Sequence, residues 1–258
     1  MGLPQEEMLG IKKQTLGSSL TSRRGIAQGL IVSIAQKWSK IKEILVDFIR
    51  LISAERFNAY RISDDENESA VINRYLWNAQ LCSAFYVPLH FVEIGLRNSL
   101  FNSISERYGQ DWLTKNILHE REQNSVNDAI SDLKKRKEPC HTGKIIAELS
   151  FGFWGSLLYQ KYDAPSFKDK SKAVFWPYCI KNSFPYMHSH FRTRKHIEKK
   201  IEKIKRFRNR IFHHEPIWKM NLNENYNDIL EVISWFYKDY AKIVSIDNVK
   251  ELLSQKQV

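Results

Sequence analysis

Apolar residues recur at steps of three and four along most of this chain, which is the spacing of one face of a helix. The first such stretch covers residues 26–52, with apolar positions at Ile31, Ile34, Trp38, Ile41, Ile44, Leu45, Phe48 and Leu51. The polar residues before it, 1 to about 24, are expected to form a flexible start. No alternation with a period of two is long enough to indicate a strand, so the pattern predicts an all-α fold.

The same periodicity divides the rest of the chain into further helices. After an acidic turn at residues 63–68, one helix is expected through Tyr75 and Leu81, and Pro88 separates it from another over about 89–108. Gly109 is expected to end that second helix, because glycine tolerates the left-handed backbone of a helix end. Later helices are predicted over residues 119–137 and 144–149, over about 192–215 before Pro216, and over about 226–244.

The domain organisation follows from this series. Residues 1–52 are expected to form an N-terminal extension, a flexible start followed by a long amphipathic helix, and residues 53–258 the main helical domain. The chain has only 10 Gly and 7 Pro, and 43% of its residues are hydrophobic, so it can build helices around a sizeable core.

Charge and cysteine usage bear on the class of partner and on the cellular compartment. The formal net charge of +11 attracts polyanions, although charge alone does not identify nucleic acid as the partner. The three cysteines, Cys82, Cys140 and Cys179, form no CxxC pair, which is typical of a reducing compartment. No run of about 18 apolar residues is evident, so we expect a cytoplasmic protein without a membrane partner.

The histidine and cysteine positions do not indicate a metal site. Cys140 and His141 are adjacent, and His188 and His190 follow Cys179 at spacings that match no standard zinc site. We therefore expect solvated loop residues there, no metal and no cofactor.

Candidate chemistry lies near the end of the basic helix. Apolar residues form one stripe there, at Ile197, Ile201, Ile204, Phe207 and Ile211. On an ideal helix Arg208 lies about 40° from Ile204, so its side chain points into or beside that stripe. A guanidinium in such a place needs an acidic partner or an anion, because burying an unpaired charge is costly.

Amide and imidazole groups follow this arginine. Asn209 and His213 are four residues apart, so the amide is expected to orient the imidazole. Histidine transfers protons near neutral pH, and arginine binds phosphate with paired donors, so the set suits cleavage of RNA by its own 2′-hydroxyl. From chemistry alone, however, two histidines such as His213 and His214 at the end of a basic helix are more often an ordinary balance of the negative C-terminal dipole by positive charge.

A larger set of motifs resembles a known family. Arg208-Asn209-x-x-x-His213 resembles the Rx(4–6)H motif of the HEPN superfamily. Further segments come in the order and spacing of Abi-like (abortive infection) proteins: Ser53-Ala54-Glu55-Arg56-Phe57-x-x-Tyr60, Leu89-x-x-x-Glu93-x-x-Leu96-Arg97-Asn98, Tyr108-Gly109-x-x-Trp112, Leu149-Ser150-Phe151-Gly152-Phe153-Trp154 and Arg208 to Ile217. The resemblance covers about residue 53 to the C-terminus.

This resemblance implies a HEPN-type helical bundle that acts in bacterial antiphage defence as a toxic, metal-independent endoribonuclease. It implies a homodimer that takes RNA but not DNA as substrate, and some relatives are thought to bind a small non-coding RNA. By the family pattern, Arg208 and His213 are the catalytic pair and Asn209 supports them. His214 also fits the allowed spacing, so the choice between the two histidines stays open.

Other residues are assigned around this pair. Glu93 and Arg97 either form an internal ion pair, which we favour, or support the Arg208 site. Basic side chains lead toward that site and are expected to follow the RNA backbone: Arg192, Arg194, Lys195, Lys199, Lys203 and Arg210. The aromatic group Phe151 to Trp154 is expected to pack in the core rather than stack on bases.

Two other functions are compatible with these features. The chain is alternatively a non-catalytic RNA-binding module that holds a structured RNA or a toxin partner, or a pure protein-interaction module, which the charge argues against. The retained Arg208 and His213 favour the enzyme, because a binding module would not need them.

Overall fold

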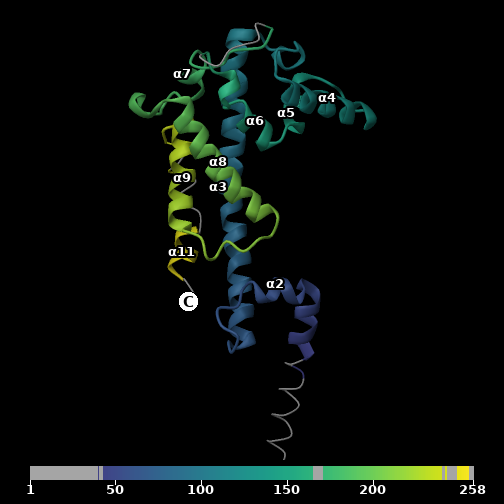
Figure 1. Cartoon of the computed structure of the whole chain (residues 1–258), viewed down its shortest axis with the longest axis vertical. Helices are drawn as coiled ribbons and strands as arrows, with labels where there is room; N and C mark the ends of the chain where they lie inside the picture. The colour runs from purple at the N-terminus through teal and green to yellow at the C-terminus, as the bar shows by residue number, and fades with distance from the viewer. Residues whose placement is uncertain (1–39, 41–42, 165–170, 240–241, 243–248, 256–258) are drawn as a thin grey trace, which may run out of the picture. The chain divides into compact units, whose positions relative to one another are not determined.

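The computed structural model describes residues 40, 43–164, 171–239, 242 and 249–255, and these form α-helices and short 3₁₀ helices without a strand (Figure 1). The predicted all-α fold is therefore confirmed. The chain divides into two compact units, Met1–Asn73 and Arg74–Val258. The division falls inside a helix, later than the boundary expected after residue 52.

The first unit contains short helical segments. Residues 43–52 are helical, as expected, while most of the predicted helix over 26–52 lies outside the described residues. Helix α2 (Ala54–Asn58) follows, and the hydroxyl of Ser53 caps it by accepting from the backbone N–H of Arg56. Phe57 and Tyr60 are buried in this unit, whereas Ile44 and Leu51 are exposed.

Helix α3 (Glu68–Tyr108) runs without a break through Pro88. The expected separation into two helices is therefore wrong. Proline removes one backbone hydrogen bond, and Pro88 lies among buried residues whose packing outweighs that loss. The end of the helix is as predicted, because Gly109 has a φ of 88° and its N–H donates to the carbonyl of Ser105.

By length and composition α3 is also apolar enough to cross a membrane, alone among the helices of the described part of the chain. Polar residues such as Asn78, Ser83 and His90 interrupt this helix, so it contains no unbroken run of 18 apolar residues, as expected. A core helix of a soluble protein has the same composition, and α3 buries Phe85, Leu89, Leu96 and Leu100 in the second unit.

A group of short helices packs near the C-terminal end of α3. It comprises 3₁₀ helix η1 (Trp112–Thr114), α4 (Glu120–Lys135), α5 (Thr142–Glu148) and α6 (Phe151–Ser156). The side chain of Ser150 caps α6, and Phe151, Phe153 and Trp154 are buried, so the predicted core role of this aromatic segment is confirmed.

The segment before the basic helix is irregular. It contains η2 (Gln160–Tyr162), α7 (Ile180–Ser183) and η4 (Ser189–Phe191), with an isolated β-bridge between Asp163 and Trp176. The hydroxyl of Tyr162 donates to the buried carboxylate of Glu122 in α4 at 3.0 Å, which ties this segment to that helix. Burial, with that carboxylate second, raises the pKa of Tyr162, so the phenol stays neutral.

Three helices complete the second unit: α8 (Arg194–Phe212), α9 (Leu222–Phe236) and α11 (Val249–Ser254). Asn221 caps α9, which begins and ends earlier than the predicted helix over 226–244. Residues 240–241 and 243–248 lie outside the described residues. In Figure 1, α9 runs beside α3 and α8 crosses it.

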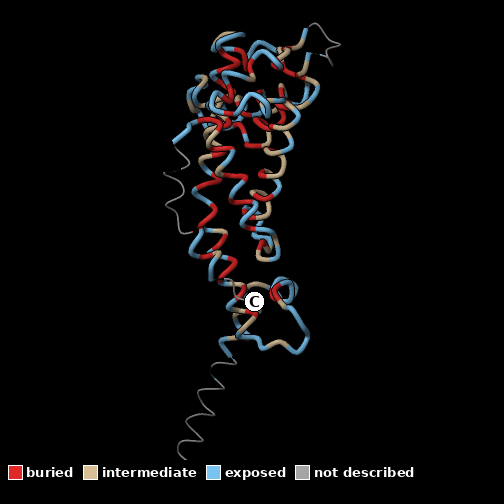
Figure 2. The backbone as a smooth tube through the Cα atoms, turned by 90° about the vertical axis from the view of Figure 1, so that its left-hand side faces the viewer, coloured by how far each residue is buried: buried red, intermediate tan, exposed pale blue. Residues whose placement is uncertain are grey.

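Aromatic rings join helices α3, α8 and α9. The ring of Phe85 meets Phe207 of α8 at 4.9 Å between centroids and Tyr226 of α9 at 6.1 Å. Gly95 of α3 lies under the ring of Phe236, where a Cβ atom would come within 2.7 Å of the ring. Figure 2 shows buried residues recurring along the facing sides of these helices.

Candidate functional site at the end of helix α8

Helix α8 places Arg208 at the edge of the core. Thr193 caps the helix by accepting from the N–H of His196, and the predicted stripe is confirmed, because all five of its apolar residues are buried: Ile197, Ile201, Ile204, Phe207 and Ile211. Arg208 follows Phe207 in sequence, and its side chain is 27% exposed. It lies beside the stripe, as expected.

The guanidinium of Arg208 is held loosely by three neighbours. One terminal nitrogen lies 3.4 Å from the Glu93 carboxylate and the other 3.5 Å from the side-chain oxygen of Asn209. The guanidinium carbon stands 4.0 Å from the centroid of the Phe212 ring, a cation–π contact. Its Nε is buried and has no hydrogen-bond partner among the described residues. These contacts orient the group and engage each terminal nitrogen once, whereas a guanidinium carries two N–H groups on each of them.

The backbone hydrogen bonds at the end of α8 set the main-chain positions of His213 and His214. The N–H of His214 donates to the carbonyl of Ile211, and the N–H of Glu215 donates to that of Arg210. This pair of bonds is the Schellman ending of a helix. It places His214 in the left-handed region, at a φ of 57°, where glycine is the usual residue. His213 is the last residue before this turn.

The structure gathers only part of the predicted catalytic set. Glu93, Arg208 and Asn209 come together, whereas the side chains of His213 and His214 are exposed and have no side-chain partner among the described residues. Asn209 contacts Arg208 rather than His213. The expectation that this amide orients the imidazole does not describe the contact found.

The favoured ion pair between Glu93 and Arg97 is not the one that forms. Glu93 pairs with Arg208, and the Nε of Arg97 lies 3.4 Å from the side-chain oxygen of Asn98. Glu93 therefore supports Arg208, which is the role that the alternative interpretation gave it. Arg97 lies one turn further along α3.

Most of the basic residues expected to follow RNA are engaged within the chain. Arg194 lies 2.9 Å from Asp163 and also pairs with Glu198, and its side chain is only 13% exposed. Arg192 donates to the carbonyls of Met187 and Pro185, and Arg210 to that of Pro216. Lys195 and Lys199 are exposed, without an ion pair in the described part of the chain.

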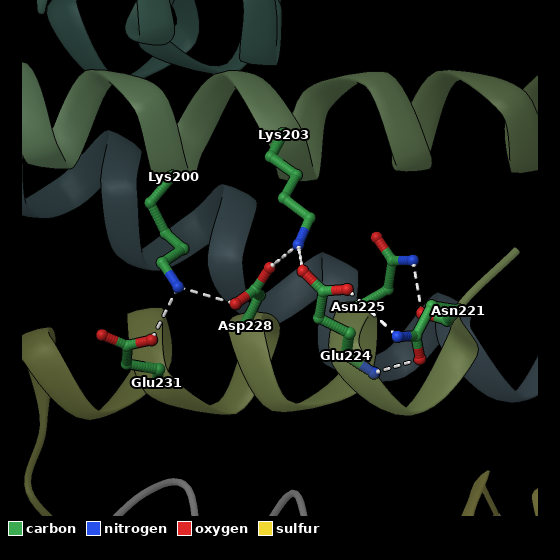
Figure 3. Close-up of polar contacts among 7 residues, drawn as sticks. All are labelled: Lys200, Lys203, Asn221, Glu224, Asn225, Asp228 and Glu231. Carbon is green, nitrogen blue, oxygen red and sulfur yellow. Dashed lines mark hydrogen bonds and ion pairs between the residues drawn. The ribbon is translucent and has the colours of Figure 1, made fainter.

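A paired cluster occupies the middle of α8 (Figure 3). Asp228 of α9 accepts from Lys200 and Lys203, each at 2.6 Å, and its side chain is 10% exposed. Lys200 also meets Glu231 at 2.8 Å, and Lys203 also meets Glu224. The cluster joins α8 to α9, so Lys203 has a structural role.

The protonation states in this cluster follow from its pairing. Burial alone would raise the pKa of Asp228, but the hydrogen bonds from Lys200 and Lys203 outweigh it and lower that pKa. Burial alone would lower the pKa of both lysines, but their carboxylate partners outweigh it and raise those values. All three groups therefore stay charged near neutral pH.

Residues that the sequence did not single out complete the surroundings of Arg208. Tyr86 and His90 of α3 lie one helical turn apart with their rings stacked, and Phe212 lies 5.9 Å from Tyr86 between centroids. In the sequence, only their spacing of four residues could have indicated that the two rings lie on the same face of a helix. The contact between Tyr86 and Phe212 of α8 was not predicted.

Other features do not add to this site. No group of three or more His, Cys, Asp or Glu side chains that would hold a metal ion exists among the described residues, and His141 instead caps α5. A cavity of about 520 Å³ between α3 and α9 is lined by Asn98, Asn102 and Phe236 among others, and none of its lining residues belongs to the predicted site.

Comparisons with protein-family models, curated proteins and solved structures found no match to this chain. Its function is therefore inferred from the residues and their geometry.

Proposed function

We propose that this chain is a metal-independent endoribonuclease of the HEPN type, with Arg208 as the phosphate-binding group. The observation that carries the proposal is the setting of Arg208, a guanidinium oriented by Glu93 and Phe212 near the end of a helix that is followed by two exposed histidines. An RNA phosphate fits this setting, because arginine binds phosphate oxygens through paired N–H groups.

The chemistry needs no group beyond these side chains and the RNA. The ribose 2′-oxygen attacks the adjacent phosphorus while a neutral histidine takes the hydroxyl proton. The bond from phosphorus to the 5′-oxygen breaks, and that oxygen gains a proton from a histidinium or from water. The products carry a 2′,3′-cyclic phosphate and a 5′-hydroxyl. DNA is not a substrate, since it lacks the attacking hydroxyl.

Each residue has a distinct part in this scheme. Arg208 neutralises the charge that develops on the phosphorane oxygens. Glu93, at 3.4 Å, holds the guanidinium in place in the free protein and is easily outcompeted by phosphate. His213 is the first candidate for proton transfer and His214 the second, since both are exposed at the end of the same helix.

We further propose that the chain is a cytoplasmic, homodimeric Abi-like protein that acts in abortive infection. The ordered motifs from Ser53 to Ile217 support this assignment through their resemblance to that family. A surplus charge of +11 suits RNA, both as the substrate and as a bound non-coding RNA.

The test is cleavage of total cellular RNA in excess EDTA by the full chain and by an Arg208→Ala/His213→Ala variant. We expect the variant to lose at least about a thousandfold in rate, because it lacks both charge stabilisation and proton transfer. The matched control is Arg206→Ala/His190→Ala, which removes an exposed arginine from the same helix and an exposed histidine elsewhere. The new ends are mapped for 2′,3′-cyclic phosphate.

Two outcomes would count against the enzyme. Cutting that is equal in the variant and the wild type would remove Arg208 and His213 from the mechanism. No cutting by any protein, with RNA retained by all of them through purification, would favour the RNA-binding module instead.

A further inference from the structure

Three aromatic rings form one surface next to Arg208. The rings of Tyr86 and His90 are nearly parallel, at 15° and 6.2 Å between centroids. Phe212, on the last turn of α8, continues the surface at 5.9 Å from Tyr86. Tyr86 is 54% exposed and Phe212 39% exposed, and the neighbouring Val87 is exposed as well. We call the group of Tyr86, His90 and Phe212 the aromatic surface.

Packing among the residues that the structure describes does not explain the aromatic surface. Large rings that meet on the outside of a folded unit leave apolar area in water, and such a patch beside polar groups marks a contact site. The core of the second unit is already built from other rings, including Phe85, Phe207 and Tyr226. The exposed rings are therefore available to a molecule outside this core.

The charge beside the surface indicates the class of that molecule. The Arg208 guanidinium covers one side of the Phe212 ring at 4.0 Å, so a cation and an exposed aromatic group stand together. A flat, apolar ring attached to an anion matches both groups at once, and a nucleotide has that composition. Aromatic side chains next to cationic groups bind single-stranded nucleic acid in this way, with bases on the rings and phosphates on the cations.

We propose that the aromatic surface stacks an unpaired RNA base of the nucleotide adjoining the phosphate that Arg208 binds. This inference rests on the proposed function, because it takes Arg208 as the phosphate site. A base inside a duplex is covered by its neighbours and cannot reach the rings. The substrate class is therefore single-stranded or looped RNA, accepted with little sequence preference, since every base has a flat face.

The test measures binding rather than cleavage, in a His213→Ala background that leaves the aromatic surface and Arg208 intact. The probes are a fluorescent unstructured oligoribonucleotide and the same oligonucleotide with abasic riboses. Tyr86→Leu removes the central ring and keeps apolar bulk, and we expect it to weaken binding of the base-bearing probe about tenfold. Binding of the abasic probe should not change, and Tyr86→Phe should bind both probes as the parent does.

The control variant is Tyr186→Leu, which removes a tyrosine of similar exposure, 56%, outside the aromatic surface. Equal binding by Tyr86→Leu and its parent would overturn the proposal, as would an equal loss on both probes. A change in mass by sedimentation with unchanged RNA binding would also overturn it, since the surface would then belong to a protein contact. If the wild type binds as expected but never cleaves, the proposed enzyme fails and the base-stacking surface stands.

Discussion

Two regions of helix α8 carry similar charge and use it differently. In the middle of the helix, Lys200 and Lys203 meet Asp228 at 2.6 Å, and Asp228 is almost fully buried. At the end of the helix, Arg208 meets the Glu93 carboxylate at 3.4 Å, and the two side chains are 27% and 31% exposed. A basic run in a sequence can therefore mix charges that stabilise the fold with charges that remain available to bind a ligand.

The largest effect expected from this contrast is on the paired region. Asp228→Asn leaves two partly buried lysines with only their outer carboxylates, so the free energy of unfolding should fall by about 2 kcal/mol. Urea unfolding followed by circular dichroism measures it. Asp239→Asn, which removes an exposed carboxylate 2.8 Å from Lys242, should leave the unfolding midpoint unchanged, because solvent screens that pair. If both substitutions lowered the free energy of unfolding equally, the buried pair would stabilise the fold no more than the exposed pair.

Acid should act on the same region. The folded pKa of Asp228 is below its unfolded value of about 3.9, so its contribution is present above that pH and is lost as pH falls through the folded pKa. The lysine pKa values are raised, so their contribution is lost only as pH rises above about 10. Melting temperatures of the wild type and Asp228→Asn should therefore converge below about pH 4. If the difference between the two melting temperatures stayed the same as the pH fell below about 4, the pairing of Asp228 with the lysines would be contradicted.

The free charges are tested by RNA affinity. Lys195→Ala/Lys199→Ala removes two exposed lysines, so binding to single-stranded RNA should weaken about tenfold, and the salt dependence should fall by about 0.7 per lysine. Lys134→Ala/Lys135→Ala removes two exposed lysines from α4 and is the control. If both double variants lose the same affinity, the binding is spread over the whole surface and does not follow α8.

The smallest effect expected is on the turn that ends α8. His214→Gly relieves the left-handed backbone at a φ of 57° and should stabilise the fold by about 1 kcal/mol, whereas His214→Ala keeps that backbone cost. Thermal melts compare the two. Cleavage assays on the same two variants separate the effect of the backbone from that of the imidazole. Loss of RNA cleavage in both variants would assign proton transfer to His214. Retention of cleavage in both would assign it to His213.

The sequence predicted the features that depend on local spacing. The all-α fold, the buried stripe of α8, the end of α3 at Gly109 and the core position of Phe151 to Trp154 each follow from neighbours within one or two turns. The break expected at Pro88 was wrong because tertiary packing carries the helix across a residue that weakens it locally.

The side-chain partners could not be predicted in this way. Glu93 and Arg208 are 115 residues apart, and Lys200 and Asp228 are 28 apart, so their pairing depends on how helices pack. A count of charges along α8 gives no sign of which lysines α9 neutralises. The position of Tyr86 beside Phe212 could not be predicted either, because it also depends on how α3 packs against α8.

The close approach of α3 and α9 at Gly95 has a consequence for sequence variation. The ring of Phe236 occupies the space that a side chain at position 95 would need, so the two positions share one volume. A related chain with alanine or serine at position 95 is expected to carry a smaller residue at position 236. The two positions should therefore change together during evolution, so their joint variation would report this helix contact without a structure.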